Sequence, residues 1–124
     1  MPVLVAVRDL LFRSRIHAAA ERLGIDVRLL PRGTPLSEGA RALGGGTVIA
    51  DLSEPGALEE IRAAKAAGDV RVVGFLGHLE VDLARAASEA GADEVLSRGE
   101  LSRRLDDVLR AAAGAPAPGG GARD

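Results

Sequence analysis

Five glycines at near-regular intervals constrain the fold of this chain more than any other feature. Each ends a segment in which apolar residues recur at helical spacing, and the first four are followed by a short apolar segment. Glycine is favoured just past a helix because it adopts the left-handed conformation that closes the last turn. These glycines are Gly24, Gly44, Gly68, Gly91 and Gly114. The pattern predicts a strand–helix unit that is repeated five times.

The expected strands and helices alternate from one end of the chain to the other. The expected strands cover residues 3–7, 25–30, 47–51, 70–76 and 94–96. The expected helices cover residues 10–23, 36–43, 55–67 and 79–90, and a fifth helix follows Ser97. The strands are apolar enough for burial on both faces, which is typical of parallel sheets. Right-handed crossovers then require helices on both sides of the sheet.

We therefore expect an α/β protein, a three-layer (βα)5 sandwich around a parallel five-stranded sheet of order 2-1-3-4-5, as in flavodoxin-like folds. One domain should cover residues 1–113. From residue 114 the chain is rich in Pro and Gly and has little apolar surface to bury, which predicts a disordered tail over 114–124. In this topology the crevice between strands one and three is the expected functional position.

Composition argues against several classes of function. The chain of 124 residues has no Cys, so disulfides and thiolate chemistry are excluded. A net charge of −2 and only two aromatic residues argue against nucleic-acid binding. No apolar run is long enough for a membrane span, and the first residues do not form a signal peptide. We expect a cytoplasmic protein that binds neither nucleic acid nor membrane.

Charged and polar residues gather where the expected strands end. Two carboxylates, with the carbonyl of Ser53, could hold Mg²⁺, which prefers oxygen ligands. An aspartate beside such a cation could accept a phosphoryl group, with Arg98 neutralising the developing charge. The metal candidates are Asp9 and Asp51, and the remaining pocket candidates are Arg8, Ser53, Gly77, His78 and Arg98.

These residues resemble the receiver domains of two-component response regulators, over roughly residues 3–112. The sharpest match is the run Val-Ile-Ala-Asp-Leu-Ser-Glu-Pro-Gly at 48–56. Receivers carry a phosphoacceptor Asp at the end of strand three with Pro four residues later, and Asp51 and Pro55 have this spacing. The run at 91–96 resembles the turn and fifth strand of a receiver, and Arg98 stands where the family has a lysine.

Other positions depart from the receiver pattern. The acidic pair after strand one reads Arg8-Asp9, and the hydroxyl residue after strand four is replaced by Leu76 or Gly77. The lysine–proline step reads Arg98-Gly99, and the aromatic switch position holds Val95. A guanidinium at Arg8 could pair with Asp51 or Asp9 and supply the charge that Mg²⁺ would otherwise supply. We infer a degenerate pseudo-receiver whose output is protein binding.

Simpler structural roles remain open for the same residues. Asp9 could cap the first helix, Ser53 the third and Ser97 the fifth. Asp51 could be a strand-end carboxylate that accepts hydrogen bonds from neighbouring amides, and Arg98 a surface ion-pair partner.

Three classes of function are compatible with this sequence. The first is a stand-alone receiver-like module with atypical or absent phosphorylation of Asp51. The resemblance implies that it binds a histidine kinase or an output protein through the fourth helix, fifth strand and fifth helix. The second is a small-molecule or nucleotide-binding domain that uses the crevice between strands one and three. An enzyme ranks last, because no catalytic constellation is visible.

Overall fold

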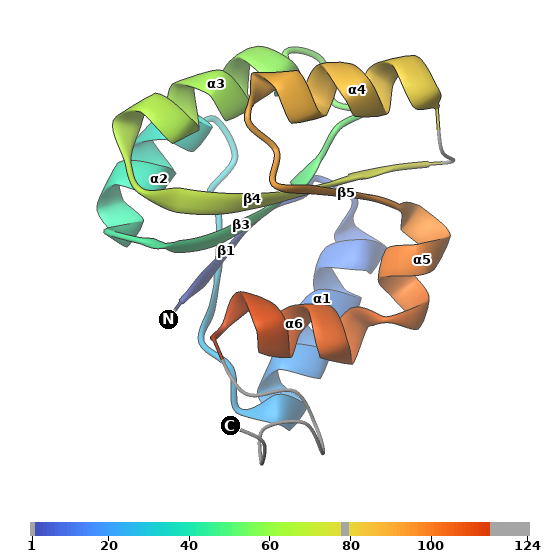
Figure 1. Ribbon diagram of the computed structural model, residues 1–124. Coiled ribbons are helices and arrows are strands. Elements are labelled where there is room, and N and C mark those ends of the chain that lie inside the picture. Colours follow the sequence, from blue (N-terminus) through green and yellow to red (C-terminus); the bar gives the residue numbers. More distant parts are fainter. Residues whose placement is uncertain (1, 78–79, 115–124) are drawn as a thin grey trace, which may run out of the picture.

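A five-stranded parallel sheet runs through the middle of the molecule (Figure 1). The computed structural model describes residues 2–77 and 80–114. Its strand order is β2-β1-β3-β4-β5, which confirms the expected topology. The strands are β1 Val3–Ala6, β2 Val27–Leu29, β3 Gly46–Asp51, β4 Val70–Leu76 and β5 Glu94–Ser97.

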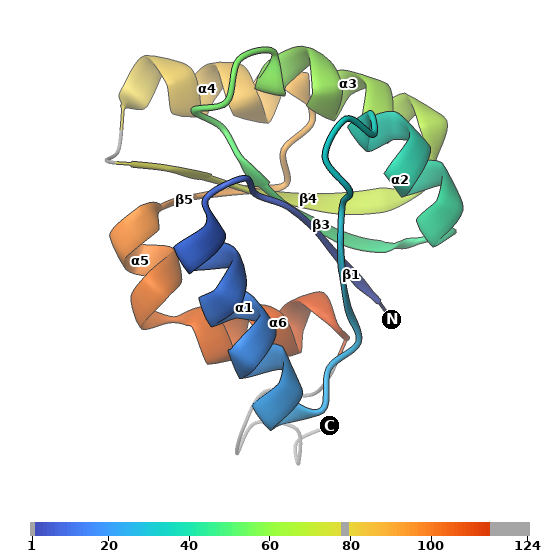
Figure 2. The same ribbon diagram turned by 180° about the vertical axis from the view of Figure 1, so that it is seen from behind.

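Helices cover both faces of the sheet, as right-handed crossovers require. One face carries α1 (Leu10–Leu23), α5 (Arg98–Arg103) and α6 (Leu105–Ala112). The other carries α2 (Leu36–Leu43), α3 (Ala57–Ala67) and α4 (Val81–Ala90), and Figure 2 shows the same two layers from behind. None of the described helices is long and apolar enough to cross a bilayer.

Alternation along the strands divides the core into two apolar clusters, because successive side chains point to opposite faces of a sheet. On one face Ile49, Val73 and Phe75 pack with α1 and α6 through Ile16 and Leu109. The opposite cluster joins the sheet to α2, α3 and α4 and includes Leu4, Val48, Leu52, Val72 and Ile61. Both faces of the central strands are therefore buried, as their continuous apolar sequences predict.

Most of the periodic glycines close helices as expected. Gly24, Gly44 and Gly91 have positive φ directly after α1, α2 and α4. Gly68 also follows its helix, α3, and its N–H donates to the carbonyl of Ala64, but its φ is −159° and its backbone is extended. A Cβ at this position would lie 3.2 Å from the carbonyl oxygen of Ala40. Close approach to the end of α2, rather than a left-handed turn, therefore favours glycine at position 68.

Two expected helix boundaries are wrong. The third helix does not begin at Pro55, because turns occupy residues 52–56 and Gly56, at φ 78°, precedes Ala57. The fifth helix is interrupted at Arg104, whose φ and ψ are −107° and 21°, so that it forms α5 and α6. The Arg104 carbonyl still accepts a hydrogen bond from Val108 N, and the second helix continues closely from the first.

Other expected features fall partly or wholly outside the described residues. The start expected for the fourth helix, residue 79, is one of these, and the described helix begins at Val81. The expected tail is described only at Gly114. Its disorder stays a prediction.

Candidate functional site

The carboxyl ends of the central strands bring together residues that are far apart in the chain. Parallel pairing sets Ala6 of β1 opposite Ala50 of β3, so the segments that follow these residues emerge side by side. Asp51 is paired with Phe75 of β4, and Leu76 with Ser97 of β5. This edge is the predicted position between strands one and three.

Asp9 is the N-cap of α1. Its Oδ1 accepts hydrogen bonds from Leu11 N at 3.0 Å and from Phe12 N at 3.2 Å. These amides have no partner within the helix, so a capping carboxylate stabilises them. The hydrogen bond from Phe12 N, with the nearby Arg98 guanidinium, lowers the pKa of Asp9 despite some desolvation. The capping role considered for Asp9 is thus confirmed.

Asp51 is buried at the end of β3 and makes local hydrogen bonds. Its Oδ1 accepts from Ser53 N at 3.0 Å and from the Ser53 hydroxyl at 2.6 Å. The capping role suggested for Ser53 is therefore wrong, since its side chain does not cap α3. It turns its donors back to the carboxylate two residues earlier. The side chain of Asp51 is only 5% exposed, so these bonds hold it in a fixed orientation.

The guanidinium of Arg98 links the two aspartates. Its Nη1 donates to Asp9 Oδ2 at 3.1 Å, and its Nη2 lies 3.9 Å from Asp51 Oδ2. The first contact is a hydrogen bond and the second is a longer ion pair. The sequence places Arg98 directly after β5, where Ser97 caps α5 by accepting from Glu100 N, as expected.

Both aromatic residues of the chain hold this guanidinium in position. The centre of the Arg98 guanidinium lies 4.9 Å from the ring centroid of Phe12 and 5.5 Å from that of Phe75. The two rings also pack against each other, with centroids 5.2 Å apart. Attraction between a cation and a ring face adds to the attraction from the carboxylates. Arg98 is therefore fixed by four groups from three different parts of the chain.

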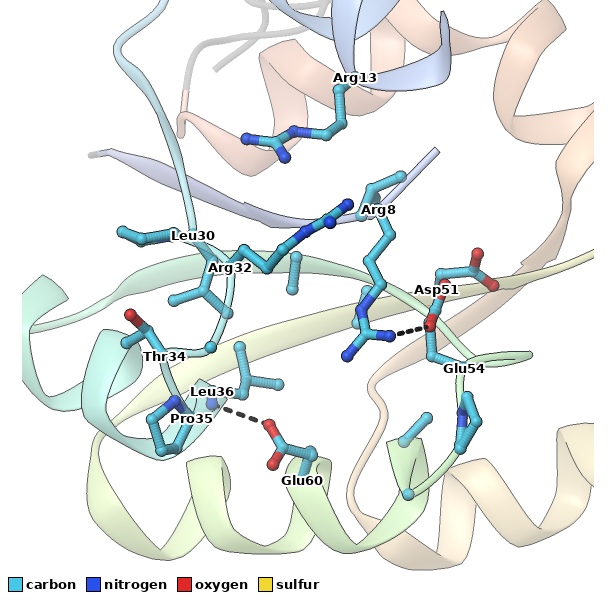
Figure 3. A pocket seen from close by; sticks show the side chains of 18 residues that line it. Arg8, Arg13, Leu30, Arg32, Thr34, Pro35, Leu36, Asp51, Glu54 and Glu60 are labelled. Atoms are coloured by element: carbon cyan, nitrogen blue, oxygen red, sulfur yellow. Dashed lines mark hydrogen bonds and ion pairs between the residues drawn. The ribbon is translucent and has the colours of Figure 1, made fainter. Parts of the chain in front are cut away.

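Arg8 does not take the position that the sequence suggested for it. Its Nη1 lies 3.4 Å from Glu54 Oε1, and its side chain is 70% exposed (Figure 3). The expected pairing of Arg8 with Asp51 or Asp9 is therefore wrong. Glu54, in the turn after β3, is within reach of Arg8, whereas Arg98 already lies against both aspartates.

The side chains at this edge do not fit the Mg²⁺ site that the receiver resemblance implies. Both oxygens of Asp9 and one of Asp51 accept hydrogen bonds, and the second oxygen of Asp51 faces Arg98. A divalent cation would have to displace a guanidinium that lies against both carboxylates and neutralises one of their two negative charges. Among the described residues, no group of three His, Cys, Asp or Glu side chains could hold a metal ion.

Two further pocket residues were predicted, Gly77 and His78, and neither adds a described contact to this site. Gly77 follows β4 and is exposed, and a Cβ there would meet nothing within 4 Å. His78 lies outside the described residues.

Sequence reasoning missed two features of this edge. No role at this edge was predicted for Phe12 or Phe75, although they are the chain's only aromatic residues. Arg13 and Glu60 also line a cavity next to Asp51, and neither was considered. Arg13 could have been found from its spacing, since it lies one helical turn after Asp9.

Comparison with known proteins identifies the class to which this fold belongs. No protein-family profile matches the sequence, and no curated protein sequence matches it. Solved structures of response regulators do match. A response regulator from Thermotoga maritima has a TM-score of 0.76 at 18% identity, covering 92% of this chain and 98% of that chain.

Two proteins from Burkholderia are similar to the same extent. A receiver protein from Burkholderia phymatum has a TM-score of 0.72 at 22% identity, covering 94% of this chain and 98% of its own. A response regulator from Burkholderia pseudomallei has a TM-score of 0.74 at 22% identity, over 91% of this chain and 68% of that one. That structure contains a phosphorylated aspartic acid, a calcium ion and citrate. The chain has the fold of a response-regulator receiver domain.

Proposed function

We propose that this chain is a receiver-like signalling module that acts by binding other proteins, without phosphorylation of Asp51 and without Mg²⁺. One observation carries the proposal: the guanidinium of Arg98 lies between Asp9 and Asp51. In this proposal the chain binds other proteins in the cytoplasm and does not catalyse a reaction.

The hydrogen bonds of the aspartates support this proposal. Phosphoryl transfer to a carboxylate needs an exposed attacking oxygen and cations that neutralise the transferred group. The Asp51 side chain is 5% exposed, and Ser53 engages its Oδ1. Arg98 is itself held by Asp9 and two rings, so moving it toward an incoming phosphoryl group would break those contacts.

We further propose that the partner binds the surface formed by α4, β5 and α5, as the receiver resemblance implies. β5 is an edge strand of the sheet. Val81 at the start of α4 is 65% exposed, and the charged side chains of Asp82 and Arg85 flank it on the same helix. The partner would be an output protein or a histidine kinase.

The phosphorylation part of this proposal is tested with the wild type and Asp51→Asn. Each protein is incubated with Mg²⁺ and beryllofluoride or acetyl phosphate, and the amide signals of residues 49–56 are followed by NMR. We expect that adding the reagents leaves the spectrum of each protein unchanged. Saturable shifts in the wild type that Asp51→Asn abolishes would show that Asp51 is an active acceptor.

A further inference from the structure

A cavity of about 320 Å³ opens beside Asp51, and Arg98, Phe12 and Phe75 are not among the residues that line it. It lies between the ends of β1 and β3, the loop after β2 and the starts of α2 and α3 (Figure 3). This volume is at the lower end of the range for small-molecule pockets. Part of its wall is apolar, from Val7, Leu36 and Ala50, and part is charged.

Three arginines and three carboxylates line the cavity, so its formal charges balance, but not all of them pair with one another. Glu54 pairs with Arg8, and Glu60 accepts a hydrogen bond from Leu36 N at the start of α2, at 2.8 Å. Asp51 is opposed by Arg98. Two lining arginines, Arg13 and Arg32, form no ion pair with any described residue.

Arg13 also has an unmet hydrogen-bonding need. Its Nε is shielded from solvent and has no acceptor within the described part of the chain. A buried donor without an acceptor is unfavourable, so a ligand oxygen that drew the Arg13 side chain round and accepted from its Nε would relieve this cost. In Figure 3 the Arg13 side chain comes from α1 and that of Arg32 from the loop after β2, on the side of the cavity opposite Glu60.

The walls around these arginines are restricted in conformation. Pro31 and Pro35 bracket the loop that carries Arg32, and Pro55 lies across the cavity in the turn after β3. Proline fixes φ and so reduces the ordering that binding would require. A cavity with stiff walls and two guanidiniums that form no ion pair with the described residues, on the side opposite Glu60, is suited to an anion.

We propose that this cavity binds a small organic molecule with a phosphate or carboxylate group, whose oxyanion is held by Arg13 and Arg32. The apolar wall would contact the rest of the ligand. Guanidinium groups suit both kinds of oxyanion because they donate hydrogen bonds in a planar fork. This binding does not depend on whether Asp51 accepts a phosphoryl group.

The proposal is tested by NMR titration of the protein in buffer free of phosphate and Mg²⁺. The probes are AMP for a phosphate, citrate for a carboxylate, and adenosine as the neutral counterpart of AMP. The double variant Arg13→Gln/Arg32→Gln is compared with Arg41→Gln/Arg62→Gln, which removes the same charge from exposed residues outside the cavity. If the first variant lacks a dispersed spectrum, Arg32→Gln in the exposed loop replaces it.

We expect saturable shifts of Gly33, Thr34, Leu36 and Gly56 with AMP, citrate or both, and the responding probe identifies the oxyanion. Removing Arg13 and Arg32 should weaken binding about tenfold or more, and the control variant should not change it. The shifts should persist in Asp51→Asn, which separates this site from the phosphorylation experiment. Three results would each overturn the proposal: no saturation with either anion, equal binding of adenosine and AMP, or equal weakening by both double variants.

Discussion

Arg98 Nη1 donates a hydrogen bond to Asp9 Oδ2 at 3.1 Å, across 89 residues of sequence. The other oxygen of the same carboxylate caps α1. The pair therefore ties the start of α5 to the start of α1 on one face of the sheet. A single guanidinium thus links the helix-capping aspartate to the aspartate that resembles a phosphoacceptor.

Replacing Arg98 with Met should destabilise the fold by about 1 kcal/mol, because the cation–ring contacts with Phe12 and Phe75 are lost. The figure is modest because the side chain is 36% exposed and water screens its ion pairs. Urea unfolding measures the change. Arg28→Met, which removes an exposed pair with Asp26, is the control and should have a smaller effect. Equal losses in both variants would show that the rings add nothing to Arg98.

Asp51 should tolerate Asn better than Ala. Asp51→Ala leaves Ser53 N and its hydroxyl without their acceptor and should cost about 1–2 kcal/mol of unfolding free energy. Asp51→Asn keeps an oxygen at that position, so its cost should be about half of this or less. Urea unfolding of both variants gives the comparison. If Asn and Ala are equally destabilising, the negative charge rather than the local hydrogen bonds stabilises this turn.

Acid should destabilise the protein through a defined set of aspartates. Burial raises the pKa of Asp93, but hydrogen bonds from Lys65 Nζ and Val72 N outweigh it, and the net pKa lies below 3.8. A hydrogen bond from Arg22 likewise lowers the pKa of Asp106, as the bond from Phe12 N does for Asp9. Their contribution is present above the unfolded-state pKa and is lost as pH falls through the lower folded-state pKa.

The free energy of unfolding should therefore fall from about pH 5 toward about pH 2, and the fall should be smaller in Asp93→Asn. Urea unfolding at a series of pH values measures both slopes. Glu89→Gln, on the exposed face of α4, controls for the change in net charge. Identical slopes in wild type and Asp93→Asn would contradict the role given to the Lys65–Asp93 pair.

Gly74 of β4 should not accept a side chain. A Cβ there would lie 2.8 Å from Cγ of Leu52, the buried residue that follows Asp51. Gly74→Ala should cost about 1–3 kcal/mol, whereas Gly77→Ala, where the space is open, should cost little. Because Leu52→Ala removes the clash, the double variant should lose less stability than the sum of the two single variants. Strict additivity in thermal or urea unfolding would argue against this contact.

The order of strands and helices could be predicted from the sequence because apolar spacing and helix-closing glycines recur in every unit. Gly68 ends a helix as expected, but glycine is favoured there because α2 approaches closely and not because of a left-handed turn. Only the tertiary packing reveals this reason. For the candidate site, the sequence predicted which residues meet but not all of their contacts. Asp9, Asp51 and Arg98 come together as their strand ends require.

The assignment of the arginines could not be made from sequence. Arg8 and Arg98 both follow strands at the same edge, and the direction of a long flexible side chain depends on its neighbours. Glu54 attracts Arg8, while two rings and two carboxylates hold Arg98. The one available clue was that the chain's two aromatic residues lie on α1 and β4, the elements that border this edge.

The most direct test of this account is an NMR titration of wild type and Arg98→Met with Mg²⁺. Because Arg98 occupies the space between the two carboxylates and would have to be displaced, the wild type should show no saturable shifts of the amides around Asp9 and Asp51 at millimolar Mg²⁺. Arg98→Met removes that cation, and its amides should respond more strongly. Saturable shifts in the wild type that Arg98→Met leaves unchanged would contradict the claim that Arg98 takes the place of a metal ion.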